Sequence, residues 1–377
     1  MTTASQLQLR RGTAAQVAAF TGAAGEVTPD TTNNRLILHD GTTAGGHPQA
    51  SEAYVDNAIA GAVATAGVAS LNGQTGALVL NVAPQGRLAL ASGVPVMTTS
   101  QAGATTVYYT PFAGNMLPIY DGTDMIPTAF TELSQATTDT TKSPAAVSAS
   151  KVYDLFVWND SGTIRCTRGP AWTNDTTRGY TLTMVGGILL NNSSITNGPA
   201  ASRGTWVGTI KSNASSTVDY ILGAAASGGT AAVLNVWNAY NQVLVCPSVV
   251  DNGATYTYTT GTTRQARASA GNQISYVVGA AGSAISASYA AGVNTVALAN
   301  SFGRFGIGID STTTMAGVPH IVYSQAAAAM VSTASISYQF QTALGAHVIS
   351  ANETGDGTNA NTFDNLSLNN LSATLWM

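Results

Sequence analysis

The sequence predicts a mainly β chain built from many short strands. Thr, Val, Tyr and Ile are plentiful, and Gly and Asn interrupt them at short intervals, a mix that favours strands joined by tight turns. Only 8% of the residues are charged, against roughly 25% in an ordinary soluble domain. Because 45% of the residues are hydrophobic, the low charge does not indicate disorder. It indicates instead that much of the surface faces other chains, since interface cores are depleted in charge.

Residues 1–50 predict a small α+β module. Residues 5–11 are expected to form a strand, and a capping box opens a short Ala-rich helix over Thr13–Phe20. A hairpin is expected over residues 26–39, followed by turns rich in Asp and Gly. A module of this size buries little core by itself.

Residues 51–67 predict a helix with a narrow apolar seam. Val55, Ile59, Ala62 and Ala66 are spaced as the a and d positions of a coiled coil. A helix of about four turns is marginal alone, so we expect it to pair with copies of itself in a three-helix bundle. A surface helix lying on its own domain is the alternative.

The rest of the chain is expected to be strand after strand. Residues 68–83 are predicted to be a linker, 84–200 a β-rich middle domain, and 201–377 a distal β-sandwich or jelly-roll-like domain. The clearest hairpin lies at 151–169, and the best helical exception lies at 143–152.

Charge and cysteine content exclude several classes of protein. The net charge is −4, and the eleven Arg and three Lys form no basic stripe, so nucleic-acid binding is not expected. The first thirty residues lack the apolar core of a signal peptide, and no apolar run is long enough to span a bilayer, which predicts synthesis in a cytoplasm and no membrane insertion. The two cysteines, Cys166 and Cys246, are expected to be small buried hydrophobes and not a disulfide framework.

Enzyme signatures are missing from the sequence. His39, His47, His320 and His347 lie far apart, without the spacing of metal ligands. No G-x-S-x-G, P-loop or dinucleotide fingerprint is present, and the glycines of GRFGIGID are expected to allow close packing of a strand. We therefore expect no catalytic residue, no cofactor and no metal.

Two pairs of carboxylates are candidates for a glycan-cleaving site. They are Asp121 with Asp124, and Glu353 with Asp356. Both pairs lie in Gly-rich segments, so we expect turn residues that accept hydrogen bonds from their own backbone.

The five tryptophans are Trp158, Trp172, Trp206, Trp237 and Trp376. Most are expected in the cores of the β domains. Trp172 lies in RGPAWTNDTTRG, a segment rich in turn formers, and is predicted to be an exposed residue that contacts a ligand.

Several motifs occur together in the first fifty residues. They are LRRGT with an Ala-rich helix, then Gly25-Glu26, Asn33–Leu36 and Asp40–Thr43. This pattern resembles the amino-terminal module of bacteriophage tail fibres and related tropism proteins. VASLNGQTGALVL is similar to a linking element of phage fibres, and a long segment after residue 107 resembles a module of phage structural proteins.

The resemblance implies a virion fibre or spike that is an intertwined homotrimer. Residues 1–50 would attach to capsid, neck or tail proteins, with Arg10, Arg11, Arg35 and Asp40 as candidate contacts. The C-terminal β domain would then bind a host-surface glycan or protein. A threefold assembly also explains the seam helix, the low charge and the small first module. A head or collar decoration without a host ligand is the alternative, and a glycan depolymerase is less favoured.

Overall fold

The computed structural model describes residues 9–50, 52–65, 70–71, 74–75, 82–325, 328–363 and 369–377, with the backbone alone at 52–53, 62–65, 70–71 and 74–75. The chain divides into two compact units, Met1–Val79 and Leu80–Met377. The division falls inside the predicted linker.

Residues 9–50, called the head below, hold a one-turn helix and a small antiparallel sheet. The helix is α1 (Ala14–Ala18), and the sheet runs β1 (Val27–Asp30), β2 (Arg35–Leu38) and β3 (His47–Pro48). The predicted capping box is confirmed, because the Thr13 hydroxyl accepts from the backbone N–H of Gln16 while the Gln16 side chain accepts from that of Thr13. The hairpin is confirmed as well.

The strand expected at residues 5–11 is not confirmed. Residues 5–8 lie outside the described residues, and 9–11 form no strand. The chain instead enters the head through a single parallel bridge between Gly12 and Asp30.

The remaining elements of the first unit are α2 (Glu52–Thr65) and the short strands β4 (Ser70–Leu71) and β5 (Gln74–Thr75), which pair with each other. Helix α2 corresponds to the helix predicted at 51–67. Over the described part of the chain, no helix is both long and apolar enough to cross a lipid bilayer.

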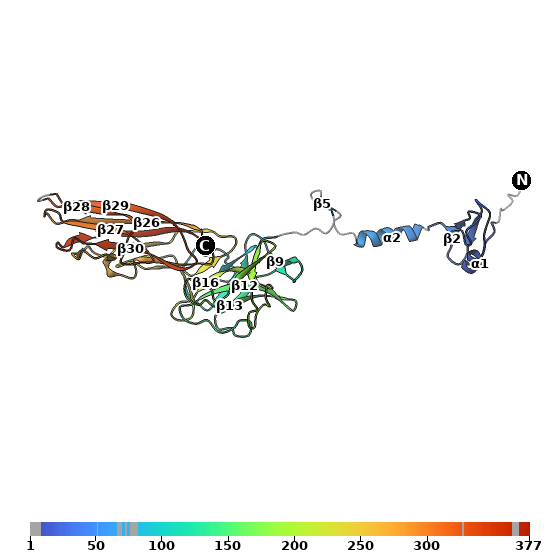
Figure 1. Cartoon of the computed structure of the whole chain (residues 1–377), viewed down its shortest axis with the longest axis horizontal. Helices are drawn as coiled ribbons and strands as arrows, with labels where there is room; N and C mark the ends of the chain where they lie inside the picture. The colour runs from blue at the N-terminus through green and yellow to red at the C-terminus, as the bar shows by residue number, and fades with distance from the viewer. Residues whose placement is uncertain are drawn as a thin grey trace. The chain divides into compact units, whose positions relative to one another are not determined.

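The second unit begins with three of its five sheets, which Figure 1 shows in cyan and green. The two small ones pair β10 (Met125–Ala129) with β9 (Met116–Tyr120), and β11 (Leu133–Ala136) with β8 (Thr106–Pro111) and β6 (Gly86–Ala89). The six-stranded sheet runs β13 (Thr163–Ala171), β12 (Val152–Asp160), β16 (Thr205–Lys211), β15 (Ile188–Asn191) and β14 (Leu182–Val185), with β20 (Val236–Asn238) on β16.

Two eight-stranded sheets complete this unit. The first runs β28 (Ala316–Tyr323), β27 (Phe302–Ile309), β30 (Gly345–Thr354), β25 (Gln273–Val278), β19 (Ala232–Leu234), β17 (Val218–Ile221) and β7 (Gln101–Ala104), with β24 (Arg264–Gln265) on β30. The second runs β18 (Ala225–Ala226), β22 (Ser248–Asp251), β32 (Asn369–Trp376), β26 (Ala284–Asn294), β31 (Asn361–Phe363) and β23 (Tyr256–Tyr258), with β21 (Leu244–Val245) on β32 and β29 (Val331–Gln341) on β26. One 3₁₀ turn covers Ala266–Ala268.

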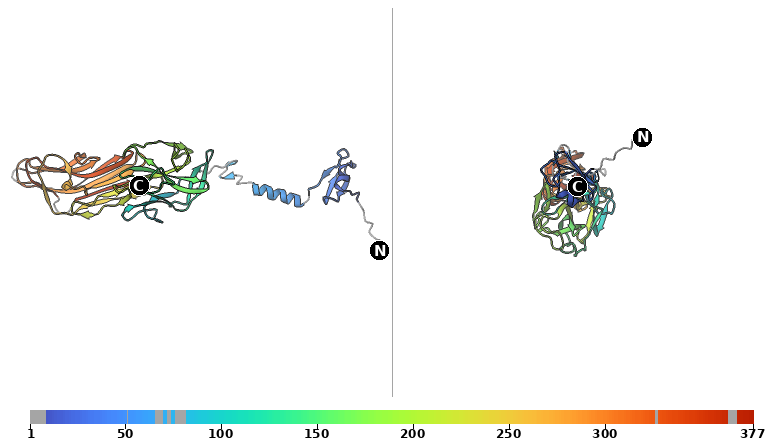
Figure 2. Two further views of the ribbon diagram at one scale, coloured as in Figure 1. Left: turned by 90° about the horizontal axis from the view of Figure 1, so that it is seen from below. Right: turned by 90° about the vertical axis from the view of Figure 1, so that its right-hand side faces the viewer.

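The two large sheets pack on each other through their apolar faces, and the orange and red strands stay together in both views (Figures 1 and 2). The rings of Tyr289 on β26 and Phe305 on β27 meet edge to face at 5.6 Å. A Cβ at Gly303 would lie 2.6 Å from a methyl group of Val293, so the glycine permits the close approach. The close packing predicted for GRFGIGID is confirmed.

The sequence placed a domain boundary at residue 200 that the structure does not show. Strand β16 from the predicted distal domain pairs with β12 from the middle one, and β17 pairs with β7. Residues 143–152, predicted to be helical, are turns and irregular chain up to the start of β12. The hairpin predicted at 151–169 is confirmed as β12 and β13, with Ser161 and Gly162 in the left-handed region at its tip.

Candidate functional site

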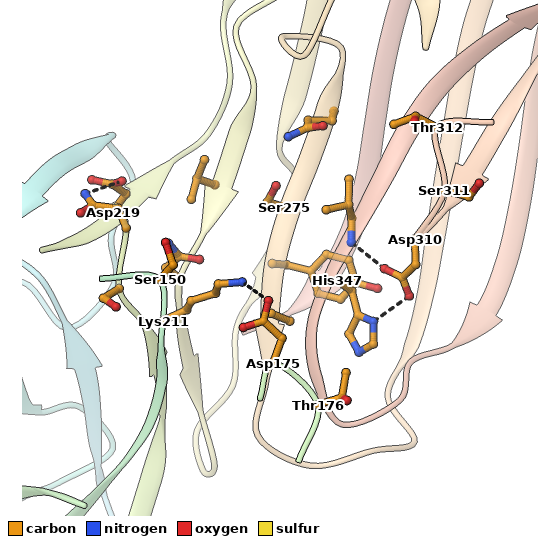
Figure 3. A pocket seen from close by; sticks show the side chains of 18 residues that line it. Ser150, Asp175, Thr176, Lys211, Asp219, Ser275, Asp310, Ser311, Thr312 and His347 are labelled. Atoms are coloured by element: carbon orange, nitrogen blue, oxygen red, sulfur yellow. Dashed lines mark hydrogen bonds and ion pairs between the residues drawn. The ribbon is translucent and has the colours of Figure 1, made fainter. Parts of the chain in front are cut away.

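An open groove of about 720 Å³ crosses the Leu80–Met377 unit beside its first eight-stranded sheet (Figure 3). Strands β16, β17, β19, β25 and β30 line it, together with the loops that follow β13 and β27. The lining is mainly hydroxyl, amide and carboxylate groups. Its members come from residues 150 to 348, so the fold and not a local motif assembles the groove.

One wall carries an ion pair and a carboxylate held in place. Lys211 Nζ lies 2.7 Å from Asp175 Oδ2, where half of the Asp175 side chain remains exposed. Asp219 accepts from Asn213 Nδ2 at 2.9 Å and from the backbone N–H of Gly103 at 2.7 Å. These contacts fix both carboxylates before any ligand binds.

The opposite wall carries Asp310 and His347. Asp310 Oδ2 lies 2.9 Å from His347 Nδ1, and Asp310 Oδ1 accepts from the backbone N–H of Val348 at 2.9 Å (Figure 3). His347 Nε2 lies 3.1 Å from the carbonyl oxygen of Ala343. Because both ring nitrogens are engaged, His347 positions Asp310 and is not a free general base.

The lining also contains the side-chain amide of Asn235. The residue is 5% exposed, and its backbone is fixed by Asp219 and Lys211. Within the described part of the chain, its side-chain amide makes no hydrogen bond, and neither does the Ser275 hydroxyl beside it on β25. Neither group is among the side-chain atoms that are buried without a partner, so both face the open groove, where a ligand or water can bond them.

The chemistry of the groove is that of polar recognition. Three carboxylates, of Asp175, Asp219 and Asp310, oppose the single ammonium group of Lys211. The lining contains the phenol ring of Tyr276 beside the imidazole of His347. Tyr276 is 1% exposed, and burial raises the pKa of its hydroxyl. Among the described residues, no group of three or more His, Cys, Asp or Glu is placed to hold a metal ion.

Trp172, predicted to be an exposed ligand contact, is buried. It is 2% exposed, and its Nε1 donates to Asp154 Oδ2 at 3.0 Å. The guanidinium of Arg178 lies 4.6 Å from its ring centroid and 5.1 Å from that of Trp206. Turn formers around Trp172 predicted a surface loop, but a buried carboxylate 18 residues earlier draws the indole inward.

Asp154 is the centre of that cluster. It is fully buried, and its two oxygens accept six hydrogen bonds. The donors are Trp172 Nε1 at 3.0 Å, Trp206 Nε1 at 3.0 Å, Arg178 Nε at 2.7 Å, Arg178 Nη2 at 3.2 Å, Tyr180 OH at 3.0 Å and Thr209 Oγ1 at 2.5 Å. The cluster ties β12, β16 and the loop after β13 together. Its role is structural.

The carboxylates of the two candidate pairs do not all have the predicted role in turns. Asp121 is a turn residue, as predicted, because Oδ1 accepts from the backbone N–H groups of Thr123 and Asp124. Asp356 likewise accepts from its own loop at Thr358. The prediction was wrong for Glu353.

Glu353 lies on β30 and is 1% exposed. It accepts from the hydroxyl of Tyr256, from Arg264 and from the backbone N–H of Arg267. Burial raises its pKa above the ordinary value of 4.5, although those hydrogen bonds oppose the shift. Glu353 and Asp356 are thus separated in role, one a core acceptor and one a turn cap.

We expect Glu353→Gln to change how stability depends on pH. A carboxyl whose pKa is raised in the folded state contributes fully to the stability of the fold below its unfolded pKa, here 4.5. That contribution is lost as the pH rises through the folded pKa. Relative to Glu353→Gln, the wild type should therefore lose stability from pH 4.5 towards neutral pH. Urea unfolding at several pH values measures this, with Asp121→Asn as control; parallel curves for wild type and Glu353→Gln would contradict it.

The head places the four predicted attachment residues on its surface, three of them with partners. Arg10 pairs with Glu26 at 3.5 Å and Arg35 with Asp30 at 3.3 Å. Arg11 is exposed. Asp40 accepts from Thr43 and lies 3.1 Å from His47, and these hydrogen bonds, led by that of the Thr43 hydroxyl, hold its pKa well below the usual range.

Sequence reasoning missed an apolar face of the head. Leu9, Leu36 and Leu38 are 46, 49 and 41% exposed, whereas the buried hydrophobic side chains of residues 9–50 are only Val17 and Ile37. The alternation in β2 that buries Ile37 was the available signal, because it turns both flanking leucines outward.

The seam residues of α2 are exposed where they are described. Val55 is 41% and Ile59 is 56% exposed. Ala62 lies on the same helix, and Ala66 lies outside the described residues. The helix therefore offers an apolar strip without a cover in its own chain at these two positions.

Of the remaining candidates, Cys166 is buried as predicted, which raises its pKa to about 12, whereas Cys246 is exposed and corrects the prediction. His39 is buried between Thr28 and Gly22, and His320 lies 3.1 Å from Ser332.

Trp206 and Trp237 are buried in the core, as expected for most tryptophans, and their ring centroids lie 5.5 Å apart. Trp158 is half-buried, and its Nε1 donates to Thr167 at 2.6 Å. Trp376 on the last strand is 48% exposed, so it does not belong to that core.

Comparison with known proteins concerns the head first. Residues 7–43 match the family model described as the major tropism determinant N-terminal domain. This segment is similar to a tropism-determinant N-terminal domain. The resemblance proposed from LRRGT and the motifs after it is confirmed for this part of the chain.

Matches to whole proteins are narrower. A segment of 53 residues is 53% identical to the tail fiber receptor-binding protein of Bordetella phage BPP-1, and it spans 14% of this chain and 14% of that protein. Solved structures of the Major Tropism Determinant I1 and P3c variants align at 22% identity with TM-scores of 0.18 and 0.19, covering 72 and 68% of this chain and 56 and 52% of theirs.

Proposed function

We propose that this protein is a bacteriophage virion fibre or spike that its head anchors and whose second unit contacts the host surface. The match of residues 7–43 to the tropism-determinant N-terminal domain is the observation that carries the proposal. The relative that is 53% identical over 53 residues is named as a tail fiber receptor-binding protein, which supports the same role here. The protein is then a virion component made in the host cytoplasm.

The working form is a homotrimer. The head buries only two hydrophobic side chains in its described residues and exposes three leucines, so its core is incomplete in one copy. The strip of Val55 and Ile59 on α2 needs a cover of the same kind, which a three-helix bundle supplies. The second unit buries a continuous core within one chain, so intertwining is required only of the first unit.

Attachment to the particle uses charged side chains on the surface of the head. Arg11 is exposed. The side chains of Arg10, Arg35 and Asp40 pair with other side chains of the head and remain partly exposed, so each of the four can contact a capsid, neck or tail protein. The leucines are assigned to the trimer and the charged groups to the particle.

Two other functions compete with this one. A head or collar decoration needs the same anchor but no host ligand, and the groove of the second unit favours the receptor-binding form. A glycan depolymerase needs two working carboxylates, whereas Glu353 and Asp356 are committed to the core and to a turn. We infer a binding protein without catalytic activity, cofactor or nucleic-acid partner.

The experiment combines three measurements on the full chain. Light scattering should give three times the chain mass of 38.3 kDa. Antibodies against a tag should label phage particles, and purified protein should compete with phage for adsorption to host cells. A monomer, or unlabelled particles, would overturn the fibre; labelled particles without competition would indicate the decoration.

A further inference from the structure

The geometry points to the groove as a binding site for an uncharged, hydroxyl-rich ligand, which we identify as a stretch of neutral surface glycan. This inference rests on the proposed role in host binding and names the class of its receptor. It begins from the polar floor and walls that Figure 3 shows.

The unpartnered Asn235 is the first argument. Its amide offers two donors and a carbonyl oxygen, it is 5% exposed, and it lines the groove without a hydrogen bond in the described part of the chain. The amide atoms reach the open groove and have no protein partner among the described residues there, so a ligand that both donates and accepts can take the place of solvent at this amide. Sugar hydroxyls do both.

The second argument is preorganisation. Asp219 is held by Asn213 and the Gly103 backbone, and Asp310 by His347 and the Val348 backbone. Rigid acceptors on both walls recognise vicinal hydroxyls without paying for side-chain ordering. The volume of about 720 Å³ lies within the range of ligand sites and admits an oligosaccharide.

Charge selects among glycans. The carboxylates of Asp175, Asp219 and Asp310 face the groove against Lys211, whose ammonium group is already paired with Asp175. A carboxylated or phosphorylated glycan would meet like charge with no free cation to compensate, which costs affinity. A neutral glycan avoids this penalty.

The groove lacks an exposed ring for a sugar to stack on, since Tyr276 is 1% and His347 is 8% exposed. Each site is therefore expected to bind weakly. Three sites on one trimer that engage a repeating polysaccharide raise the apparent affinity by roughly a hundredfold or more. We therefore expect a single site to bind weakly and a trimer to bind a repeating polysaccharide tightly.

The test uses the full chain and immobilised hexasaccharides. Neutral probes contain glucose, galactose, mannose, rhamnose or N-acetylglucosamine, and a galacturonate hexamer is the anionic probe. Asn235→Ala removes the free amide and Ser275→Trp fills the groove. Ser337→Trp, on the exposed side of β29, is the matched control for an added tryptophan.

We expect the wild type and Ser337→Trp to bind at least one neutral probe and not galacturonate. Asn235→Ala should weaken that binding about 5–10-fold, and Ser275→Trp should abolish it. Thermal unfolding of each variant keeps a loss of fold distinct from a loss of site; if Ser275→Trp fails to fold, Asn235→Ala decides.

The outcomes separate this inference from the proposed function. If no neutral probe binds, or if Asn235→Ala binds as the wild type does, the groove is not the glycan site, even where the protein still competes for adsorption. If neutral probes bind as expected but particles carry no label, the groove is a glycan site and the proposed role as a virion fibre is wrong.

Discussion

Asp154→Asn is expected to lower the free energy of unfolding of the Leu80–Met377 unit by about 3–5 kcal/mol. The carboxylate is fully buried and accepts from six donors, and the Arg178 side chain that it neutralises is 15% exposed. The amide keeps the shape but loses the charge, so it leaves a guanidinium uncompensated between the rings of Trp172 and Trp206. Breaking one partner of a buried ion pair is costly for this reason.

Urea unfolding followed by tryptophan fluorescence measures the effect, because Trp172 and Trp206 both donate to Asp154. Asp121→Asn is the matched control: the same chemical change in an exposed turn should cost less than about 1 kcal/mol. The double variant Asp154→Asn with Arg178→Met removes both charges and should recover part of the loss. A loss below about 1 kcal/mol for Asp154→Asn alone would contradict the structural role of the cluster.

The local elements were predictable because short-range rules determine them. The capping box at Thr13 and the hairpin of β12 and β13 each depend on residues a few positions apart. The burial of Trp172 and Glu353 was not predictable in this way. Their partners lie at Asp154 and Arg264, up to 89 residues away, and the identity of a partner so far along the chain is set by the sheet order.

The same reasoning explains the boundary at residue 200. Strand β16 follows a segment rich in turn formers, which looks like the end of a domain, yet it pairs with β12 about fifty residues earlier. The groove is a still clearer case. Asn235, Ser275 and Asp310 carry no motif, and only the order of strands β19, β25, β30 and β27 brings them to one surface.

In the head, the sequence predicted contacts through charged residues, whereas the structure also shows an exposed apolar surface. Arginines at 10, 11 and 35 are conspicuous in a chain with 14 basic residues. Leu36 and Leu38 are ordinary strand residues until the sheet is seen to bury Ile37 alone. A sheet with one covered face and one apolar open face requires a second layer, and no segment of the described head supplies it.

The second prediction follows from that open face: Leu36→Asp with Leu38→Asp should convert the proposed trimer to monomers. Burying two leucines contributes about 3–6 kcal/mol per chain, and two buried carboxylates would cost more than this gain. Light scattering of the full chain should fall from three times 38.3 kDa to a single chain mass. The second unit should keep its unfolding midpoint, because its core is complete within one chain.

Val318→Asp is the control for this experiment, since Val318 on β28 is 87% exposed and the same change there should leave the trimer intact. A double variant that remains trimeric but fails to join phage particles would assign the leucines to the particle instead of to sister chains. A wild-type chain that is already monomeric would remove the reason for the trimer, because an incomplete head core would then be stable without neighbours.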